Sequence, residues 1–180
     1  MSRFSRFLFV AAAAVFAAAC SNGAKIEGNL EGAAASDVVV KLLNVNRYEV
    51  LDTVKTDASG KFSYKVEVEK GQPEFVYVFY KDTKIASLIL EAGDNVTVEA
   101  DTLGNYTVAG SEESTKLAQV EKDFAASLLK LSDLAVKLET ASEKEAKEIS
   151  REMGQEYVRY YRDRVKYIMQ NRRSLTVVPV

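Results

Sequence analysis

The feature that most constrains the fold of this 180-residue chain is a change in its hydrophobic pattern near residue 110. Before this point, apolar and polar residues alternate in short runs broken by turn-forming residues, which is typical of half-buried strands. After it, long charged stretches repeat apolar residues at helical spacing and contain no proline until the end. We therefore expect an α+β fold, with a β-domain at residues 25–110 and a helical hairpin at 111–173.

The first part predicts about eight short strands, arranged as an antiparallel β-sandwich or open barrel. The strands are expected at residues 25–30, 37–43, 48–56, within 56–69, and at 74–80, 85–91, 96–101 and 105–110. The run EFVYVFY (74–80) is apolar on both faces, which favours a central strand. The turn AGDN (92–95) between two strands predicts a β-hairpin spanning 85–101.

The region 56–69 predicts a turn followed by a strand. Asp57, Ser59 and Gly60 are residue types that β-turns favour. The following apolar positions fall on one face at a spacing of two residues; they are Phe62, Tyr64, Val66 and Val68.

The first helix is predicted to begin after the N-cap Ser111, with two acidic residues in its first turn, and to end near Ala141. Its apolar stripe comprises Leu117, Val120, Phe124, Leu128, Leu131, Leu134 and Leu138. Ser142 and Glu145 predict a capping box for a second helix. The expected buried side of that helix comprises Ile149, Met153, Tyr157, Tyr160, Tyr161, Val165 and Ile168.

Two further features belong to this second part. Gly154 weakens the second helix by roughly 1 kcal/mol relative to alanine, and we expect a close approach of another backbone there. The apolar tail SLTVVPV (174–180) predicts either an added strand or the start of sequence beyond this chain.

The N-terminus predicts a secretory signal at residues 1–19. Arg3 and Arg6 precede an uncharged run of thirteen residues, 7–19, which is shorter than the roughly 20 residues that a spanning helix needs. Cys20 follows Ala17-Ala18-Ala19, so this region resembles the lipobox of bacterial lipoproteins, although Ala17 replaces the usual leucine. The resemblance implies acylation of Cys20, with residues 20–24 as a tether; ordinary cleavage that leaves a free cysteine is the alternative.

The rest of the sequence resembles a known family in its order of motifs. "LDTVKTDASGKFSYKV", "SLILEAGDNVTVEAD" and "YTVAGSEESTKLAQV" resemble the N-terminal β-domain of unknown function that precedes thioredoxin-like, disulfide-reductase-type domains in lipoproteins of Gram-negative anaerobes. The D-x-x-G-x-F motif within the first of these is also common in transthyretin-like sandwiches. The resemblance implies an accessory module facing the periplasm or the cell surface. The Cys-x-x-Cys pair of the thioredoxin-like domain is absent from this chain, so no catalytic residue can be transferred.

The residue inventory limits the chemistry. The chain has no histidine and a single cysteine, which excludes catalytic triads and zinc sites built on these residues. Asp52, Asp57, Asp94 and Asp101 lie near turns, and we expect turn and capping roles for them rather than calcium binding. We expect no metal, no cofactor and no catalytic residues.

Two groups of residues are candidates for binding. Phe75, Tyr77 and Phe79 alternate along one strand, where they form either sheet core or the lining of a ligand groove. The second helix ends in a basic stretch that could contact lipid headgroups or an acidic partner; its residues are Arg159, Arg162, Arg164, Lys166, Arg172 and Arg173. A solvated helix face is the alternative interpretation.

These observations predict a lipid-anchored lipoprotein of the cell envelope, on the periplasmic side of the outer membrane, that acts as a non-catalytic binding or accessory module for an envelope protein. Without residues 1–19 the chain has 22 basic and 26 acidic residues, a net charge of −4, which gives no reason to expect a nucleic-acid partner. Two alternatives remain open: the front part of a thioredoxin-like thiol:disulfide oxidoreductase, and a carrier of a small ligand.

Overall fold

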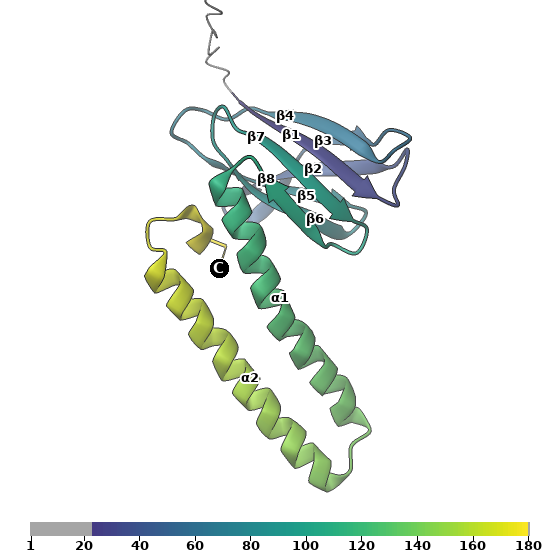
Figure 1. The fold of residues 1–180 in the computed structure, drawn as a ribbon, viewed down its shortest axis with the longest axis vertical. Helices are drawn as coiled ribbons and strands as arrows, with labels where there is room; N and C mark the ends of the chain where they lie inside the picture. The colour runs from purple at the N-terminus through teal and green to yellow at the C-terminus, as the bar shows by residue number, and fades with distance from the viewer. Residues whose placement is uncertain (1–22, 180) are drawn as a thin grey trace, which may run out of the picture.

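The short alternating runs form eight strands, which pack as two four-stranded sheets followed by two long helices (Figure 1). The structure, a computed structural model, describes residues 23–179. The signal segment and Cys20 lie outside the described residues. The strands are β1 (Ala24–Glu31), β2 (Asp37–Asn44), β3 (Arg47–Lys55), β4 (Lys61–Val66), β5 (Glu74–Tyr80), β6 (Thr83–Leu90), β7 (Asn95–Asp101) and β8 (Tyr106–Ala109).

The two sheets enclose one apolar core. Sheet A has the strand order β4-β1-β7-β8 and sheet B the order β3-β2-β5-β6. Alternate residues of each strand point between the sheets, and the buried set includes Ile26, Leu30, Val38, Val40, Val76, Val78, Leu88, Leu90, Val96 and Val98. The predicted α+β class and the predicted central position of β5, between β2 and β6, are confirmed.

The predicted hairpin at 85–101 is wrong, because β6 and β7 belong to different sheets. β6 pairs with β5, whereas β7 pairs in parallel with β1 and antiparallel with β8. The turn between them is tied to β1: Gly93 N donates to Gly23 O at 2.8 Å and Lys25 N donates to Asp94 O at 2.8 Å. The four-residue turn therefore carries the chain from one sheet to the other. Its sequence alone does not distinguish such a crossover from a hairpin within one sheet.

The helices begin where their capping residues predict. Ser111 caps α1 (Glu112–Glu139), and its side chain accepts from Ser114 N. Ser142 and Glu145 form the expected capping box at the start of α2 (Glu143–Gln170). A short 3-10 helix, η1 (Leu175–Val177), follows α2. The added strand predicted for the tail is therefore not formed in the described residues 174–179.

Only the beginning of α1 packs on the β-domain, and the rest of the hairpin extends from it as an arm (Figure 1). Leu117 and Val120 are buried there, beside β6 and β8. At 1.5 Å per residue, each 28-residue helix is about 42 Å long. Of the predicted stripe, Leu134 is also buried, but Leu128 is 51% exposed, so its predicted burial is wrong.

The predicted buried side of α2 is only partly correct. Ile149, Met153 and Tyr160 are half-buried against α1. Four other members of the set are exposed, namely Tyr157, Tyr161, Val165 and Ile168. A helix that touches one neighbour has a single contact seam, so apolar residues to one side of that seam remain open. The expectation for Gly154 is also wrong, because a Cβ at this position would meet no atom within 4 Å. No described helix is both long and apolar enough to cross a bilayer.

Candidate functional site

An aromatic cluster lies on the outward face of sheet B. The alternation of β5 sends Val76 and Val78 into the core, so Tyr77 and Phe79 point away from sheet A. β3 adds Tyr48, whose ring centroid lies 5.0 Å from that of Tyr77 and 5.5 Å from that of Phe79. Both pairs meet edge to face, a favourable arrangement for aromatic rings. The cluster is therefore built from strands that are distant in sequence and adjacent in the sheet.

Two lysines flank the aromatic cluster. Lys41 Nζ lies 4.1 Å from the ring centroid of Phe79, and Lys84 Nζ lies 5.8 Å from that of Tyr77. Both distances are within the range of cation–π attraction. Burial, together with the nearby Tyr48 and Glu121, raises the pKa of Tyr77 to about 12, so its hydroxyl stays neutral at physiological pH. The surface thus combines apolar rings with the positive charge of Lys41, because Lys84 is paired with Glu121 at 2.8 Å.

The cluster continues to an open sheet edge. β3 is the last strand of sheet B and pairs with β2 alone among the described strands. Tyr48 is 47% exposed and Val50 is 62% exposed, whereas Tyr77 is 4% exposed. Phe75 and Phe79 are half-buried on the same outward face. An extended segment could add to β3 through its backbone and place side chains on these rings.

The predicted ligand-lining residues do not line the larger of two grooves found among residues 23–179. That groove, of about 1150 Å³, lies between α1 and the ends of β7 and β8. Its β-domain side carries the carboxylates of Glu31, Glu99 and Asp101, and its helix side includes Ala125 and Leu128. Phe75, Tyr77 and Phe79 do not line this groove, and the ligand-lining role expected for them stays a prediction.

Glu121 joins α1 to both sheets at the top of the groove. Its carboxylate accepts from Lys84 Nζ, Ser87 Oγ and Tyr106 OH, each at 2.8 Å. Burial and the charge of Glu121 raise the pKa of Tyr106. Because all of these donors come from the β-domain, the cluster attaches the helix to the sheets.

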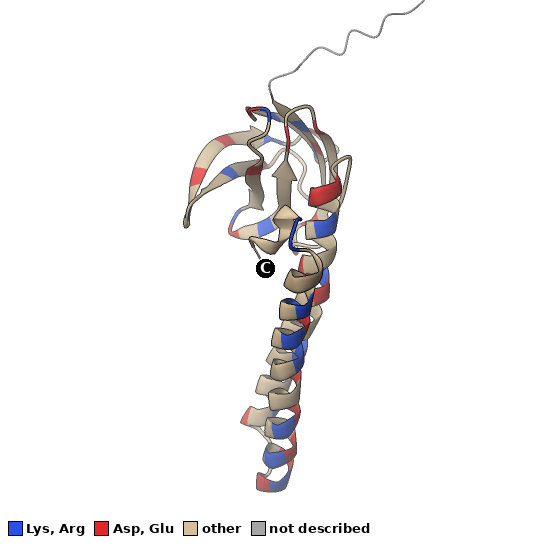
Figure 2. Ribbon diagram, turned by 90° about the vertical axis from the view of Figure 1, so that its left-hand side faces the viewer, with Lys and Arg blue, Asp and Glu red and all other residues tan. Residues whose placement is uncertain are grey.

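The basic stretch of α2 does not form one continuous charged patch. Arg159 pairs with the buried Glu156 at 2.6 Å, and Arg162 pairs with Asp163 at 3.2 Å. Arg164 turns toward α1, with its guanidinium carbon 5.9 Å from the ring centroid of Phe124. The remaining three, Lys166, Arg172 and Arg173, are exposed. Figure 2 shows acidic and basic residues mixed along the arm.

Three of the aspartates expected in turns, Asp57, Asp94 and Asp101, bond within their own turns, whereas Asp52 lies inside β3, so its predicted turn role is wrong. Asp57 accepts from Ser59 N at 2.7 Å, and Asp101 accepts from Asn105 N at 2.9 Å. Asp94 accepts from Glu91 N at 3.0 Å, and Asp52 accepts from Thr53 N at 2.7 Å. Among the described residues, no group of three or more Asp, Glu, Cys or His side chains is arranged to hold a metal ion.

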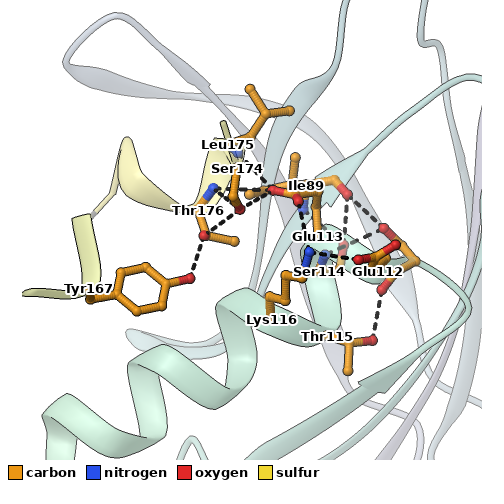
Figure 3. Close-up of polar contacts among 11 residues, drawn as sticks. Ile89, Glu112, Glu113, Ser114, Thr115, Lys116, Tyr167, Ser174, Leu175 and Thr176 are labelled. Carbon is orange, nitrogen blue, oxygen red and sulfur yellow. Dashed lines mark hydrogen bonds and ion pairs between the residues drawn. The ribbon is translucent and has the colours of Figure 1, made fainter. Parts of the chain in front are cut away.

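Glu113 and Ser114 at the start of α1 have long-range partners that the sequence did not predict (Figure 3). The Glu113 carboxylate accepts from Ser174 Oγ at 2.6 Å and from Leu175 N at 2.7 Å, which holds η1 against α1. Ser114 Oγ donates to Ile89 O at 2.7 Å and accepts from Ile89 N at 3.0 Å. An acidic residue in the first turn of a helix is already explained by its favourable interaction with the helix dipole. The sequence therefore gave no reason to expect long-range partners for Glu113.

Together, the two sheets, the outward aromatic cluster and the helical arm define a small β-sandwich module with a helical hairpin attached at one edge. Residues 24–117 match the family described as Domain of unknown function (DUF4369), and the chain belongs to this family. The match ends at Leu117, so it includes the eight strands and the first turns of α1, which attach to β6. No curated protein matches the sequence.

Proposed function

We propose that this protein is a lipid-anchored lipoprotein of the cell envelope whose β-domain binds a protein partner close to the membrane. The anchor is Cys20, which follows a signal-like apolar run and three alanines. β1 begins at Ala24, only four residues later. A diacylated cysteine gives stable membrane attachment, so the β-domain would lie next to the bilayer, with the hairpin extending from its other end (Figure 1).

The observation that carries the binding role is the outward face of sheet B beside its open edge. Tyr48 is about half exposed there and Val50 is 62% exposed, although Tyr48 packs on the buried Tyr77. Monomeric proteins usually protect an edge strand, because its free backbone groups pair readily with another chain. A partner segment in extended conformation would add to β3 and bury apolar side chains against Tyr48. An acidic side chain of that segment would meet Lys41.

The partner proposal is tested by changing this face without touching the core. In pull-downs from envelope extracts, we expect Tyr48→Ala combined with Val50→Lys to reduce recovery of the partner at least tenfold, because large aromatic residues dominate binding energy. The matched control is Leu103→Ala, since Leu103 is 82% exposed in the turn between β7 and β8. Equal recovery with both variants, or no specific partner for the parent chain, counts against the proposal.

The anchor is tested separately. Cys20→Ala removes the acylation site, so we expect the protein to move from the membrane fraction to the soluble fraction. Intact-mass analysis of the parent protein should show two or three acyl chains on a chain that begins at Cys20. A variant that stays in the membrane fraction would show that the attachment lies elsewhere.

For the basic stretch of α2, the proposal favours an acidic partner surface over lipid headgroups. The exposed Lys166, Arg172 and Arg173 lie on the arm or just after it, whereas Ala24 enters the domain at its opposite end (Figure 1). An anchor at Cys20 therefore places the β-domain between the bilayer and these cations. Their charge would then be available to a protein in the periplasm.

The resemblance to β-domains that precede thioredoxin-like domains supports a second candidate function. In that case the module is the front part of a thiol:disulfide oxidoreductase and presents substrates to a catalytic domain. The coding sequence downstream of codon 180 decides this: a continuous reading frame with a Cys-x-x-Cys motif establishes it, and a stop codon removes it.

A further inference from the structure

The two sides of the helical hairpin differ in character. One side carries an ion-pair network in which Lys130 Nζ lies 3.0 Å from Glu152 and 3.4 Å from Glu156, and Arg159 lies 2.6 Å from Glu156. Between the two sides runs the contact seam, where Phe124 packs edge to face on Tyr160 with ring centroids 5.7 Å apart. The opposite side carries small and apolar residues.

We call this second surface the apolar face of the hairpin. Its α1 residues recur at spacings of three and four, as do those of α2, so each set shares one helical face. The members are Ala125, Leu128, Ser132 and Ala135 of α1, and Gly154, Tyr157, Tyr161, Val165 and Ile168 of α2. None of them is charged, and Leu129 and Val136 border the face on α1.

The apolar face is large, and apart from its upper α1 residues Ala125 and Leu128, which also line the groove beside β7 and β8, it is open. Leu128 is 51% exposed, Tyr157 and Val165 are 54% exposed, Tyr161 is 47% and Ile168 is 37%. Leu129 and Val136 at its border are 67% and 63% exposed. At roughly 200 Å² per large side chain, about half of it open, these seven residues offer on the order of 700 Å². Monomers rarely expose so large a continuous apolar patch.

We propose that a second copy of this chain covers the apolar face, so that two hairpins form a four-helix bundle. The offered area is close to the roughly 800 Å² per partner of a standard stable interface. Closed two-fold dimers are the commonest protein oligomers, and their interface must be self-complementary. Burying this face leaves the ion-pair network on the outside of the bundle, in water.

The positions of the residues along the long axis of the hairpin, which we call their heights, favour a two-fold axis parallel to the hairpin. Because Phe124 lies beside Tyr160 and Lys130 beside Glu152, Leu128 stands at about the height of Tyr157, and Ser132 at about that of Gly154. With this axis, α1 of one copy lies over α2 of the other. Leu128 then meets Tyr157, and the small Ser132 and Gly154 let the helices approach closely.

The same axis places the two β-domains on opposite sides of the bundle. α1, rather than α2, attaches to β6 and β8, and the β-domain lies to the α1 side of the arm (Figure 1). A rotation about the arm therefore carries the second β-domain to the opposite side. The N-terminal ends of the two β-domains then lie at the same end of the dimer. Two lipid anchors in one bilayer require this arrangement, a point that rests on the proposed function.

Site-specific cross-linking of the full-length chain tests the dimer. In membranes, a bismaleimide reagent long enough to span the bundle diagonal should convert Ser132→Cys to a band at twice the chain mass, because the two copies of Ser132 lie at the same height on diagonally opposite helices, too far apart for a direct disulfide. Gln155→Cys is the matched control, since this exposed residue lies beside the charged side. The same pair in a Cys20→Ala background removes the native thiol and tests the dimer independently of the anchor.

A charge on the apolar face should disrupt the dimer. Adding Leu128→Glu to Ser132→Cys should lower the cross-linked fraction at least tenfold, whereas Leu103→Glu, on the exposed turn of the β-domain, should leave it unchanged. Circular dichroism should show the same helix content for both variants. No dimer band, equal bands from Ser132→Cys and Gln155→Cys, or a cross-link from Ser132→Cys to a different protein would each overturn the proposal.

Discussion

Glu113 links two segments that are far apart in the sequence. It stands in the first turn of α1, where a negative charge also favours the helix dipole. Its carboxylate accepts from the Ser174 hydroxyl and from the backbone N–H groups of Leu175 and, at 3.3 Å, Thr176 (Figure 3). One side chain thus caps the start of η1 and fixes the end of the described chain against the β-domain side of the hairpin.

Replacing Glu113 should release this end. Glu113→Ala removes three hydrogen bonds to a charged acceptor that is about one-fifth exposed, 22%, and we expect a loss of about 1–2 kcal/mol in unfolding free energy. Hydrogen exchange at the Leu175 and Thr176 amides should accelerate more than at any amide of the β-core. Glu112→Ala is the control, because the Glu112 side chain is 82% exposed; an equal effect would show that helix charge alone matters.

The acid sensitivity of the protein should depend on Glu113 and Glu156. Burial raises the pKa of each carboxyl, but the hydrogen bonds to Glu113 from Ser174 and Leu175, and to Glu156 from Ser127 and Arg159, outweigh it, so both pKa values lie below the ordinary 4.5. The unfolded chain then binds more protons in acid. The stabilisation is complete above about pH 4.5 and is lost as pH falls through the folded-state pKa values.

Urea unfolding between pH 7 and pH 3 measures this effect. The parent midpoint should fall steeply in the acid range. For Glu113→Gln combined with Glu156→Gln, the midpoint should be lower at pH 7 and depend less on pH. An unchanged slope in the double variant would assign the acid sensitivity to other carboxylates.

At the scale of elements, the Ser114 hydroxyl makes two of the hydrogen bonds at the junction between α1 and β6. β6 ends sheet B on the side of α1, and Ser114, which is fully buried, occupies both backbone groups of Ile89. Ser114→Ala should leave the Ile89 N–H unpaired inside the protein, whereas Ile89 O keeps its hydrogen bond from Ser111 Oγ at 3.1 Å. We expect a cost of about 1–2 kcal/mol in unfolding free energy. Ser150→Ala, an exposed site on α2, should change stability by less than about 0.5 kcal/mol. Chemical denaturation of both variants provides the comparison.

At Gly154 of α2, we predict that a substitution increases stability instead of lowering it. A methyl group there meets no atom within 4 Å, so Gly154→Ala should stabilise the isolated chain by up to about 1 kcal/mol through helix propensity. The thermal midpoint at low protein concentration measures this. A lower midpoint would reveal a backbone contact that the structure does not show.

Local chemistry made most elements predictable from the sequence. Period-two runs located the strands, and Ser111 and Ser142 located the helix starts, because these signals act within a few residues. The path from β6 to β7 was not predictable, since the Asp94 turn closes a hairpin or crosses between sheets with equal ease. The sequence named Tyr77 and Phe79, but their contact with Tyr48 and Lys41 depends on how β2, β3 and β5 align, which is a property of the whole sheet.

At the scale of the whole molecule, stability should be uneven. The β-domain has a closed core, whereas the far half of the arm has only the α1–α2 seam. Amides near the tip, such as those of Ala146 to Ile149, should therefore exchange with solvent at lower opening free energies than those of Val76 to Val78. Native-state hydrogen exchange measures this difference. Equal protection at both sites would mean that the arm and the β-domain unfold as one unit.

The position of β1 also has a mechanical consequence. β1 runs through the interior of sheet A, with β4 on one side and the parallel β7 on the other. A pull on Ala24 is directed along this strand, so it loads both ladders in shear and must break many hydrogen bonds together instead of peeling them one by one. A tether at this end can therefore transmit force between lipid and a bound protein while the domain stays folded.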